Sequence, residues 1–250
     1  MSHTIDVVFP IGSAGWVPYL ANACRFVRAQ NYPQEKIGIV VSYLYSKVEP
    51  LSDLADVCRE YDATLVMSRA DADDGFRTPL CRNRGIRRTA RDVLALIDSD
   101  VCLHPHTFTA AAQIVGANQG VILPVADMPQ GPEAPLFQTT DPAVATAISR
   151  RDGTLREAAM GALIVPRKAV MSVRGYDERM AGWGADDTDF GERLRMYGGV
   201  NLALRHDFPW ALHQHHPASN RESEQNKLNR RLYFEGGEHR NVDGWGGIPG

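Results

Sequence analysis

The sequence predicts an α/β fold in which a mostly parallel central sheet lies between two layers of helices, a three-layer α/β/α sandwich. Short apolar segments alternate with helical segments from residue 5 to residue 97, which is the order of strands and helices in a βαβαβ chain. The apolar run 93–97 ends abruptly in two carboxylates, Asp98 and Asp100, as a buried strand does at the edge of a parallel sheet. At 250 residues, the chain is long enough to bury one large core.

The individual elements follow from the positions of these runs. The expected strands cover 5–10, 37–41, 64–67, 93–97, 121–124 and 160–166, and the expected helices cover 16–30, 51–61, 79–91, 107–115, 186–197 and 220–234. Apolar residues at three- and four-residue spacing give helix 16–30 one buried face. Residues 126–151 have no such pattern, and a loop of this length is typical of a functional flap.

The composition is that of an ordinary globular protein. The hydrophobic content is 44%, the charged content is 23% and the net charge is −3, which argues against bulk binding of nucleic acid. No apolar run approaches the ~18 residues of a membrane span, and the N-terminus lacks the pattern of a signal peptide, so we expect a cytoplasmic protein. The cysteines have no C-x-x-C spacing and are expected to be reduced, partly buried thiols: Cys24, Cys58, Cys81 and Cys102.

Asp98 and Asp100 form the first candidate site. Since side chains alternate along a strand, both carboxylates would point to the same side and offer two oxygen ligands to a divalent cation. The alternative is that the two residues only begin a solvated turn. The helix 79–91, just before this strand, carries five arginines, most of which are expected to form a solvated face. Of these, Arg82 is the best placed to reach an anionic ligand at the sheet edge.

A second cluster of acidic residues opens the helix 186–197. Asp186, Asp187 and Asp189 follow the segment Gly182-Trp183-Gly184, whose glycines permit a close approach to a ligand. One of the three carboxylates is expected to cap the helix. That role does not account for the other two, and a tryptophan beside paired carboxylates is typical of a platform for a flat polar ligand with a base beneath it.

Three histidines within four residues form the third cluster: His213, His215 and His216. This density favours a metal-binding role over three separate structural histidines. Mixed carboxylate and imidazole ligation favours a transition ion such as Mn²⁺, with Mg²⁺ as the second choice because it prefers an all-oxygen shell.

Together, these clusters resemble the GT-A (Rossmann-like) glycosyltransferases, particularly family 2 enzymes with a C-terminal portion of the galactosyltransferase or polypeptide GalNAc-transferase type. The resemblance runs from residue 5 to residue 234. The matching segments are Phe9-Pro10, Arg82-Asn83-Arg84-Gly85, Asp98-Ser99-Asp100, Arg174-Gly175-Tyr176-Asp177-Glu178, Trp183-Gly184-Ala185-Asp186-Asp187, and His213, His216 and Pro217.

The resemblance implies roles for these residues. Asp100 would bind the cation that bridges the diphosphate of a nucleotide-sugar, with Asp98 near the ribose or the metal. His213 would be the third protein ligand, ahead of His216 and His215. Pro10 and Arg82 would belong to the donor site.

On the acceptor side, the resemblance makes Asp187 the general base, and it places Asp186, Trp183 and Gly184 against the acceptor. The implied function is metal-dependent, inverting transfer of a sugar from a nucleoside-diphosphate donor, UDP foremost, to a carbohydrate or other hydroxyl-bearing acceptor. A retaining GalNAc-transferase-like enzyme and a sugar nucleotidyltransferase are the enzymatic alternatives. A catalytically inactive binding module is the alternative outside enzymes.

At two positions the sequence departs from the pattern of the family. Ser42-Tyr43-Leu44 follow the second strand where the family commonly has acids that meet the nucleobase, which weakens the case for uracil; Asp186 stands where glutamate is usual.

We expect a single domain over 1–235, with a nucleotide-sugar-binding half (1–125) and an acceptor half (126–235). The Gly-rich segment 236–250 is expected to be either a disordered tail or a lid that brings Trp245 near the sugar.

Overall fold

The computed structural model describes residues 3–45, 51–69, 76–127, 154–156, 161–182, 184–216, 224–237, 241–242 and 244–247. The strands are β1 (Ile5–Ile11), β2 (Ile37–Tyr45), β3 (Ala63–Arg69), β4 (Val93–Ile97), β5 (Val101–Cys102), β6 (Gln119–Ile122), β7 (Val125–Asp127), β8 (Thr154–Arg156), β9 (Ala162–Pro166), β10 (Asn201–Leu204) and β11 (Ala211–His213). The α-helices are α1 (Val17–Arg28), α2 (Ser52–Glu60), α3 (Thr78–Ile86), α4 (Thr107–Ile114), α6 (Arg167–Ser172), α7 (Asp186–Met196) and α8 (Glu224–Phe234).

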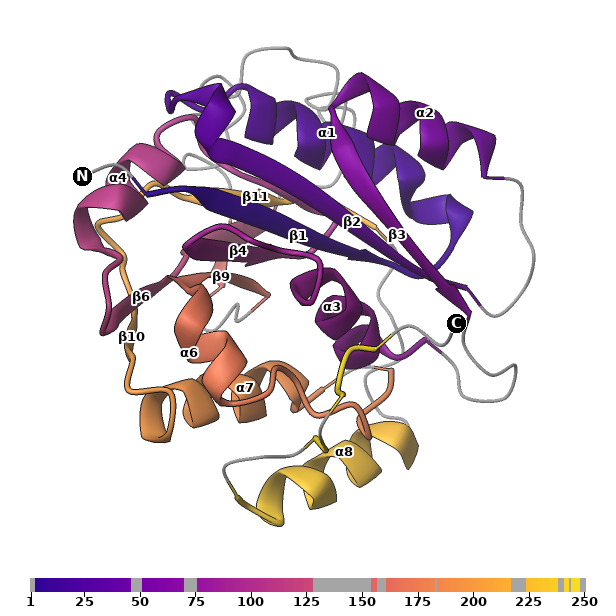
Figure 1. The fold of residues 1–250 in the computed structure, drawn as a ribbon, viewed down its shortest axis with the longest axis vertical. Helices are drawn as coiled ribbons and strands as arrows, with labels where there is room; N and C mark the ends of the chain where they lie inside the picture. The colour runs from indigo at the N-terminus through magenta and orange to yellow at the C-terminus, as the bar shows by residue number, and fades with distance from the viewer. Residues whose placement is uncertain are drawn as a thin grey trace.

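Seven of these strands form one sheet in the order β10-β6-β9-β4-β1-β2-β3 (Figure 1). All neighbouring strands run parallel except β9, which is antiparallel to both β4 and β6. This arrangement confirms the predicted α/β fold with a mostly parallel sheet. Strands from both halves of the chain contribute to this one sheet, and β1 and β4 lie at its centre with every residue buried.

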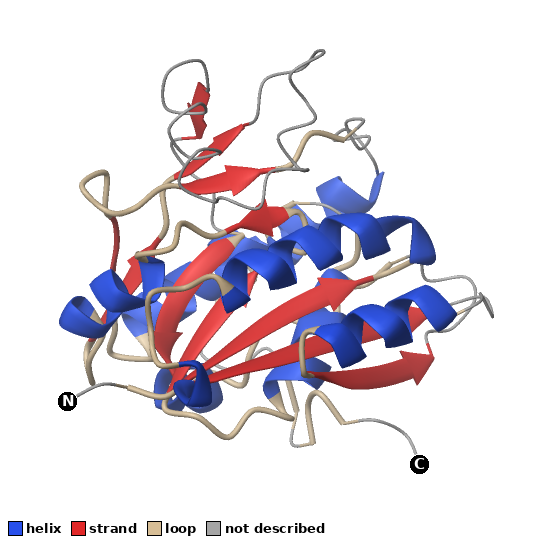
Figure 2. Cartoon of the chain, turned by 90° about the horizontal axis from the view of Figure 1, so that it is seen from above, coloured by secondary structure: helices blue, strands red, loops and turns tan. Residues whose placement is uncertain are grey.

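Helices cover both faces of the sheet. The helices α1, α2 and α4 pack on one face, where α1 and α2 lie side by side across the strands (Figure 2), and α3, α6 and α7 pack on the other. Cys24, Cys58 and Cys81 are buried in these helices, and Cys102 is buried in β5. The longest described helix, α1, has 12 residues, and none of the described helices is long and apolar enough to cross a bilayer.

The largest differences between the predicted and the observed ends of elements are at β2 and α3. The strand β2 continues to Tyr45 because Ser42 to Tyr45 remain paired with β3, and Ser42 is fully buried. The segment after Val41 is therefore the interior of a strand and not its end. The absence of acidic residues from this segment is for that reason no argument against uracil as the nucleobase. Residues 46–50, which follow β2, lie outside the described part. The helix α3 ends at Ile86, where a 3.1 Å hydrogen bond from the backbone N–H of Thr89 to the Ile86 carbonyl forms a turn.

A second, smaller sheet lies beside the carboxyl edge of the main sheet, with strand order β5-β11-β7-β8. Its strand β5 begins directly after Asp100, and its strand β11 ends at His213. The pairing of β5 with β11 therefore brings together two segments that the sequence separates by more than one hundred residues. This sheet, and not the main sheet alone, defines the position of the histidine cluster.

The helix α3 approaches the main sheet closely at Gly85. A Cβ atom at this position would lie 2.7 Å from Cγ1 of Val8 and 3.2 Å from Cβ of Ser42. Both neighbours belong to strands that are hydrogen-bonded on both sides, so neither can easily move. The absence of a side chain at Gly85 thus fixes the distance between the sheet and the helix that carries Arg82.

We predict that Gly85→Ala destabilises the protein by about 1–3 kcal/mol, because overpacking at a rigid contact outweighs the helix propensity of alanine. Urea unfolding measures the change in the free energy of unfolding. Gly116→Ala is the matched control, since no atom lies within 4 Å of an added Cβ there. Equal stability of the two variants would contradict the close approach of α3.

Candidate functional site

The carboxylates Asp98 and Asp100 lie in a turn and not on a strand. The strand β4 ends at Ile97, and the backbone N–H of Val101 donates to the carbonyl of Asp98 (3.0 Å) to close the turn. Alternation along a strand therefore does not apply, and the expectation that both carboxylates converge on one ion is corrected. Asp98 binds Arg82, whereas Asp100 faces two imidazoles.

Asp100, His213 and His216 form a group with the composition of a metal site. Oδ2 of Asp100 lies 3.4 Å from Nε2 of His213 and 3.0 Å from Nε2 of His216. One ligand atom from each residue lies within 4.8 Å of the others. His215 is exposed and is not part of this group. Asp98 does not belong to it either, so three of the four predicted metal ligands come together here: Asp100, His213 and His216.

The polar atoms of this group fit a divalent cation. Oδ1 of Asp100 is buried, and among the residues that the structure describes it has no hydrogen-bond partner. Burial opposes ionisation of Asp100, but hydrogen bonds from His213 and His216 outweigh it and lower the pKa of this carboxyl below its ordinary value. One ionised carboxylate and two imidazoles suit Mn²⁺, and they leave further positions for other ligands.

The small sheet and α1 hold the two histidines in place. In β11, His213 pairs with Val101 on one side and with Asp127 on the other. The ring of His216 packs edge-on against Trp16 (4.9 Å between centroids), next to the N-terminus of α1. These supports come from segments far apart in sequence, so they depend on the tertiary fold.

Arg82 is the centre of the acidic cluster. Its side chain is 3% exposed, and its guanidinium binds Asp98 and Oδ1 of Asp187 (2.5 Å), with Oδ2 of Asp186 at 3.8 Å. Its plane also lies over the ring of Tyr176, 4.9 Å from the centroid. Arg82, the arginine singled out from the expected solvated face, is buried among carboxylates from two distant segments.

Burial shifts the titration of this cluster. It raises the pKa of Asp186 to about 7, and the nearby charge of Asp187 adds to the shift. Burial likewise raises the pKa of Asp98 to about 6, although the Arg82 guanidinium opposes the shift. The charges of Asp100 and Asp187 both act on Asp98, which therefore lies between the metal group and the acidic cluster.

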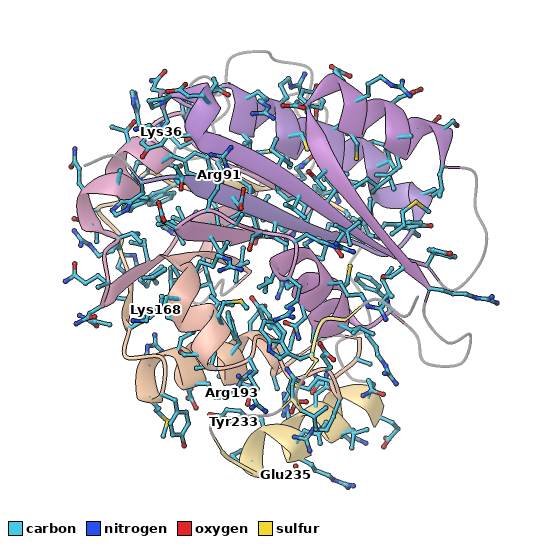
Figure 3. All side chains as sticks on the ribbon, in the orientation of Figure 1. Lys36, Arg91, Lys168, Arg193, Tyr233 and Glu235 are labelled. Atoms are coloured by element: carbon cyan, nitrogen blue, oxygen red, sulfur yellow. The ribbon has the colours of Figure 1, made fainter. Side chains whose placement is uncertain are left out.

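The helix α7 begins at Asp186 without a side-chain cap. The preceding residue, Ala185, has φ 68° and makes no capping hydrogen bond, so none of the three acids is the cap that we expected. Asp189 instead forms a buried ion pair with Arg193 (2.7 Å). Arg193 also donates to the carbonyl of Gly175 (2.8 Å), and it lies near Tyr233, where α7 meets α8 (Figure 3). Asp186 and Asp187 are thereby left to face Arg82.

The loop before α7 is held by α8. Asn229 donates to the carbonyls of Ala181 (2.8 Å) and Gly184 (2.9 Å). Gly184 has φ 106°, and a Cβ there would lie 2.2 Å from Nδ2 of Asn226. Gly184, predicted to contact the acceptor, thus has a backbone fixed next to the acidic cluster. Trp183 lies outside the described residues.

Two further residues of the resemblance have other surroundings than expected. Pro10 is buried inside β1, opposite Ser42 of β2, and not at the end of the strand. Arg84 is 5% exposed and donates to the carbonyl of Arg69 (3.3 Å), so it too is not part of a solvated face. Pro217 and residues 128–153 of the expected loop lie outside the described residues.

The structure of the C-terminal segment differs from both predictions made for it, a disordered tail and a lid. Trp245 is 6% exposed and packs in the hydrophobic cluster on the α3 face of the sheet, with Arg87 over its ring at 5.4 Å. The N–H of Gly246 donates to Glu178 (2.7 Å), which also accepts from Asn83 on α3 (2.8 Å). The described residues 241–242 and 244–247 are therefore neither a disordered tail nor a lid that carries Trp245 to the sugar.

The sequence analysis missed Asp127. Its Oδ1 lies 3.0 Å from Nδ1 of His213. The signal was present, because Asp127 is a carboxylate at the end of an apolar run, as Asp98 is. The signal is weak because Asp127 falls where the pattern of the following loop begins.

Solved structures with a similar fold include three glycosyltransferases. Mannosyltransferase PcManGT from Pyrobaculum calidifontis, in complex with GDP-Man and Mn²⁺, has a TM-score of 0.55 at 15% identity, over 94% of this chain and 62% of that chain. GalNAc-T7 with UDP, GalNAc and Mn²⁺ has a TM-score of 0.64 at 13% identity (94% and 48%). TarS 1–349 from S. aureus, in complex with UDP-GlcNAc, has a TM-score of 0.58 at 15% identity (91% and 61%). The fold is therefore the GT-A fold, and this chain spans less than two thirds of each of these proteins.

The family comparison rests on sequence. Curated protein sequences give no match. The family described as Glycosyltransferase like family 2 matches residues 6–205, a range that includes the turn of Asp98 and Asp100 and the acidic cluster around Arg82. Because this match covers most of the chain, the protein belongs to the glycosyltransferase-like family 2.

Proposed function

We propose that this protein is a metal-dependent, inverting glycosyltransferase that moves a sugar from a nucleoside-diphosphate donor to an acceptor hydroxyl. One observation carries the proposal: a single turn links a metal-type group, at Asp100, to the acidic cluster around the buried Arg82, at Asp98. Family membership and the metal-bound donors of similar folds support the same reading. UDP is our first choice of nucleotide, and the acceptor is a carbohydrate or another molecule with a free hydroxyl.

On the donor side, Asp100, His213 and His216 would hold the cation. Mn²⁺ suits this mixture of oxygen and nitrogen ligands better than Mg²⁺ does. When bound, the cation would neutralise the charge that grows on the departing nucleoside diphosphate. Asp98 and Arg82 lie next to this group and would line the donor site.

On the acceptor side, Asp187 is our general base. Arg82 binds its Oδ1 and orients the carboxylate, and Oδ2 would take the proton of the attacking hydroxyl. A hydroxyl activated on the side opposite to the leaving diphosphate reacts in a single displacement, which inverts the anomeric centre.

Asp186 would contact the same acceptor in a different way. With a pKa near neutrality, it is largely protonated below about pH 7, so it can donate a hydrogen bond to an acceptor oxygen while Asp187 accepts a proton. Gly184 and Trp183 precede this pair and would complete the acceptor site.

Nucleotide binding tests the donor site. We expect calorimetry to detect UDP binding in the presence of Mn²⁺, and Asp100→Ala to weaken it by at least about a hundredfold, because even loss of an outer-shell partner costs about 10- to 100-fold in metal affinity. GDP and TDP, and Mg²⁺ or no metal, form the comparison arms.

Asp207→Ala is the control for this experiment, because Asp207 is 69% exposed and pairs with Arg205. Its binding of UDP should equal that of the unaltered protein. If no nucleotide binds under any metal condition, the donor assignment is wrong, and the chain is better described as a binding module with a GT-A fold.

Asp187→Asn should lower the rate of transfer by about 10²–10⁴-fold and leave metal-dependent nucleotide binding unchanged, because a general base acts on the acceptor and not on the donor. The assay follows nucleotide release from a panel of UDP-sugars, first with water and then with added acceptors. Glu192→Gln, on the same helix, is the control and should retain full activity. A fully active Asp187→Asn variant would refute the assignment of the base.

Asp186 predicts a pH dependence of stability. Its pKa is about 7 in the folded protein and near 3.8 in the unfolded chain. The contribution of Asp186 to the free energy of unfolding is therefore fully present below pH 3.8 and is lost as the pH rises to about 7. Asp186→Asn should therefore gain stability over the unaltered protein across this window, by at most about 4 kcal/mol, since each pH unit contributes about 1.4 kcal/mol. Urea unfolding from pH 4 to pH 8 measures this difference, and a difference independent of pH would contradict the shift.

A further inference from the structure

The two ring nitrogens of His213 face two different carboxylates. Nε2 lies 3.4 Å from Oδ2 of Asp100, inside the metal group, and Nδ1 lies 3.0 Å from Oδ1 of Asp127, outside it. The imidazole therefore bridges the metal group and a carboxylate that has no part in the proposed chemistry.

Strand pairing produces this arrangement. The strands β11 and β7 are parallel, and their register sets His213 directly beside Asp127. Paired residues of adjacent strands point to the same face, so the carboxylate and the ring meet without any special loop geometry. On the other side of β11, pairing with Val101 brings His213 next to Asp100.

The hydrogen bond to Asp127 selects one form of the imidazole. A neutral histidine carries its proton on one nitrogen and offers a lone pair on the other. A carboxylate can only accept, so Asp127 keeps a proton on Nδ1. When a cation displaces the proton that Nε2 shares with Asp100, the lone pair of Nε2 is then directed at the metal group. Without that acceptor, the proton can also reside on Nε2, where it blocks ligation.

We propose that Asp127 is a positioning residue that holds His213 in the orientation and protonation form required to bind a divalent cation. This inference rests on the proposed metal centre. It also separates the two histidines, since the ring of His216 packs against the aromatic rings of Trp16 and Tyr19. Asp127 further adds a second negative charge beside a site that would take a doubly charged ion.

Metal binding without nucleotide tests this role. Calorimetry with Mn²⁺ alone should give a dissociation constant about ten- to a hundredfold higher for Asp127→Ala than for the unaltered protein, the range for loss of an outer-shell partner. Asp127→Asn keeps the size of the side chain and should also weaken binding, because its amide can donate to Nδ1 and favour the wrong form. Asp56→Ala removes an exposed carboxylate on α2 and should bind Mn²⁺ normally.

A second measurement separates positioning from folding. Long-range ¹H–¹⁵N spectra of the protein saturated with Zn²⁺, a diamagnetic cation that imidazole also binds, report which imidazole nitrogen is protonated, and His213→Gln identifies the His213 signal. We expect the Nδ1-protonated form in the unaltered protein and a shift towards the Nε2-protonated form in Asp127→Ala, with thermal unfolding of the metal-free proteins unchanged.

The outcomes distinguish the two proposals. If Mn²⁺ binding depends on His213 but is unaffected in both Asp127 variants, the role of Asp127 is refuted and the metal centre stands. If the unaltered protein binds no Mn²⁺, or His213→Gln binds it normally, both proposals fail. A weaker affinity together with a changed protonation form supports the role of Asp127.

Discussion

The buried charge of Arg82 is the constraint on which the rest of the site depends. A guanidinium that is 3% exposed has lost most of its contact with water, and it is stable only if carboxylates surround it. Those carboxylates come from the turn after β4 and from the start of α7, at Asp98 and Asp187. Arg82 thus joins the centre of the sheet to the acceptor half of the site, and removal of Arg82 would leave these carboxylates without their counter-ion.

Much of the surrounding structure serves to place this guanidinium. Gly85 allows α3 to lie close against β1 and β2, and the C-terminal segment packs Trp245 on the same face. The side-chain amide of Asn83, adjacent to Arg82, donates to the carbonyl of Tyr176 and accepts from its backbone N–H (2.9 Å each). It thereby ties α3 to the segment that precedes α7. The position of one charged group is therefore determined by packing and hydrogen bonds from four separate parts of the chain.

The small sheet, and not Arg82, determines the arrangement of the metal group. There, β11 lies between β5 and β7, and its last residue, His213, meets a carboxylate on each side. The turn from Asp98 to Asp100 contributes to both groups, because the carboxylate of Asp98 binds Arg82 and the carboxylate of Asp100 belongs to the metal group. The proposed donor and acceptor parts of the site therefore meet at one turn, in which Asp98 and Asp100 are only two positions apart.

The sequence by itself determined the order of strands and helices, the parallel sheet and the three clusters that bear chemistry, because periodicity and strand-end residues report the local environment of each segment. It did not reveal that Asp98 and Asp100 diverge, that Arg82 and Arg84 are buried, that Asp127 supports His213, or that Trp245 belongs to the core. Each of these depends on which distant segments meet: Arg82 and Asp187, for example, are 105 positions apart. Only the tertiary structure sets such pairings, since they follow from strand register and helix packing and not from any local pattern.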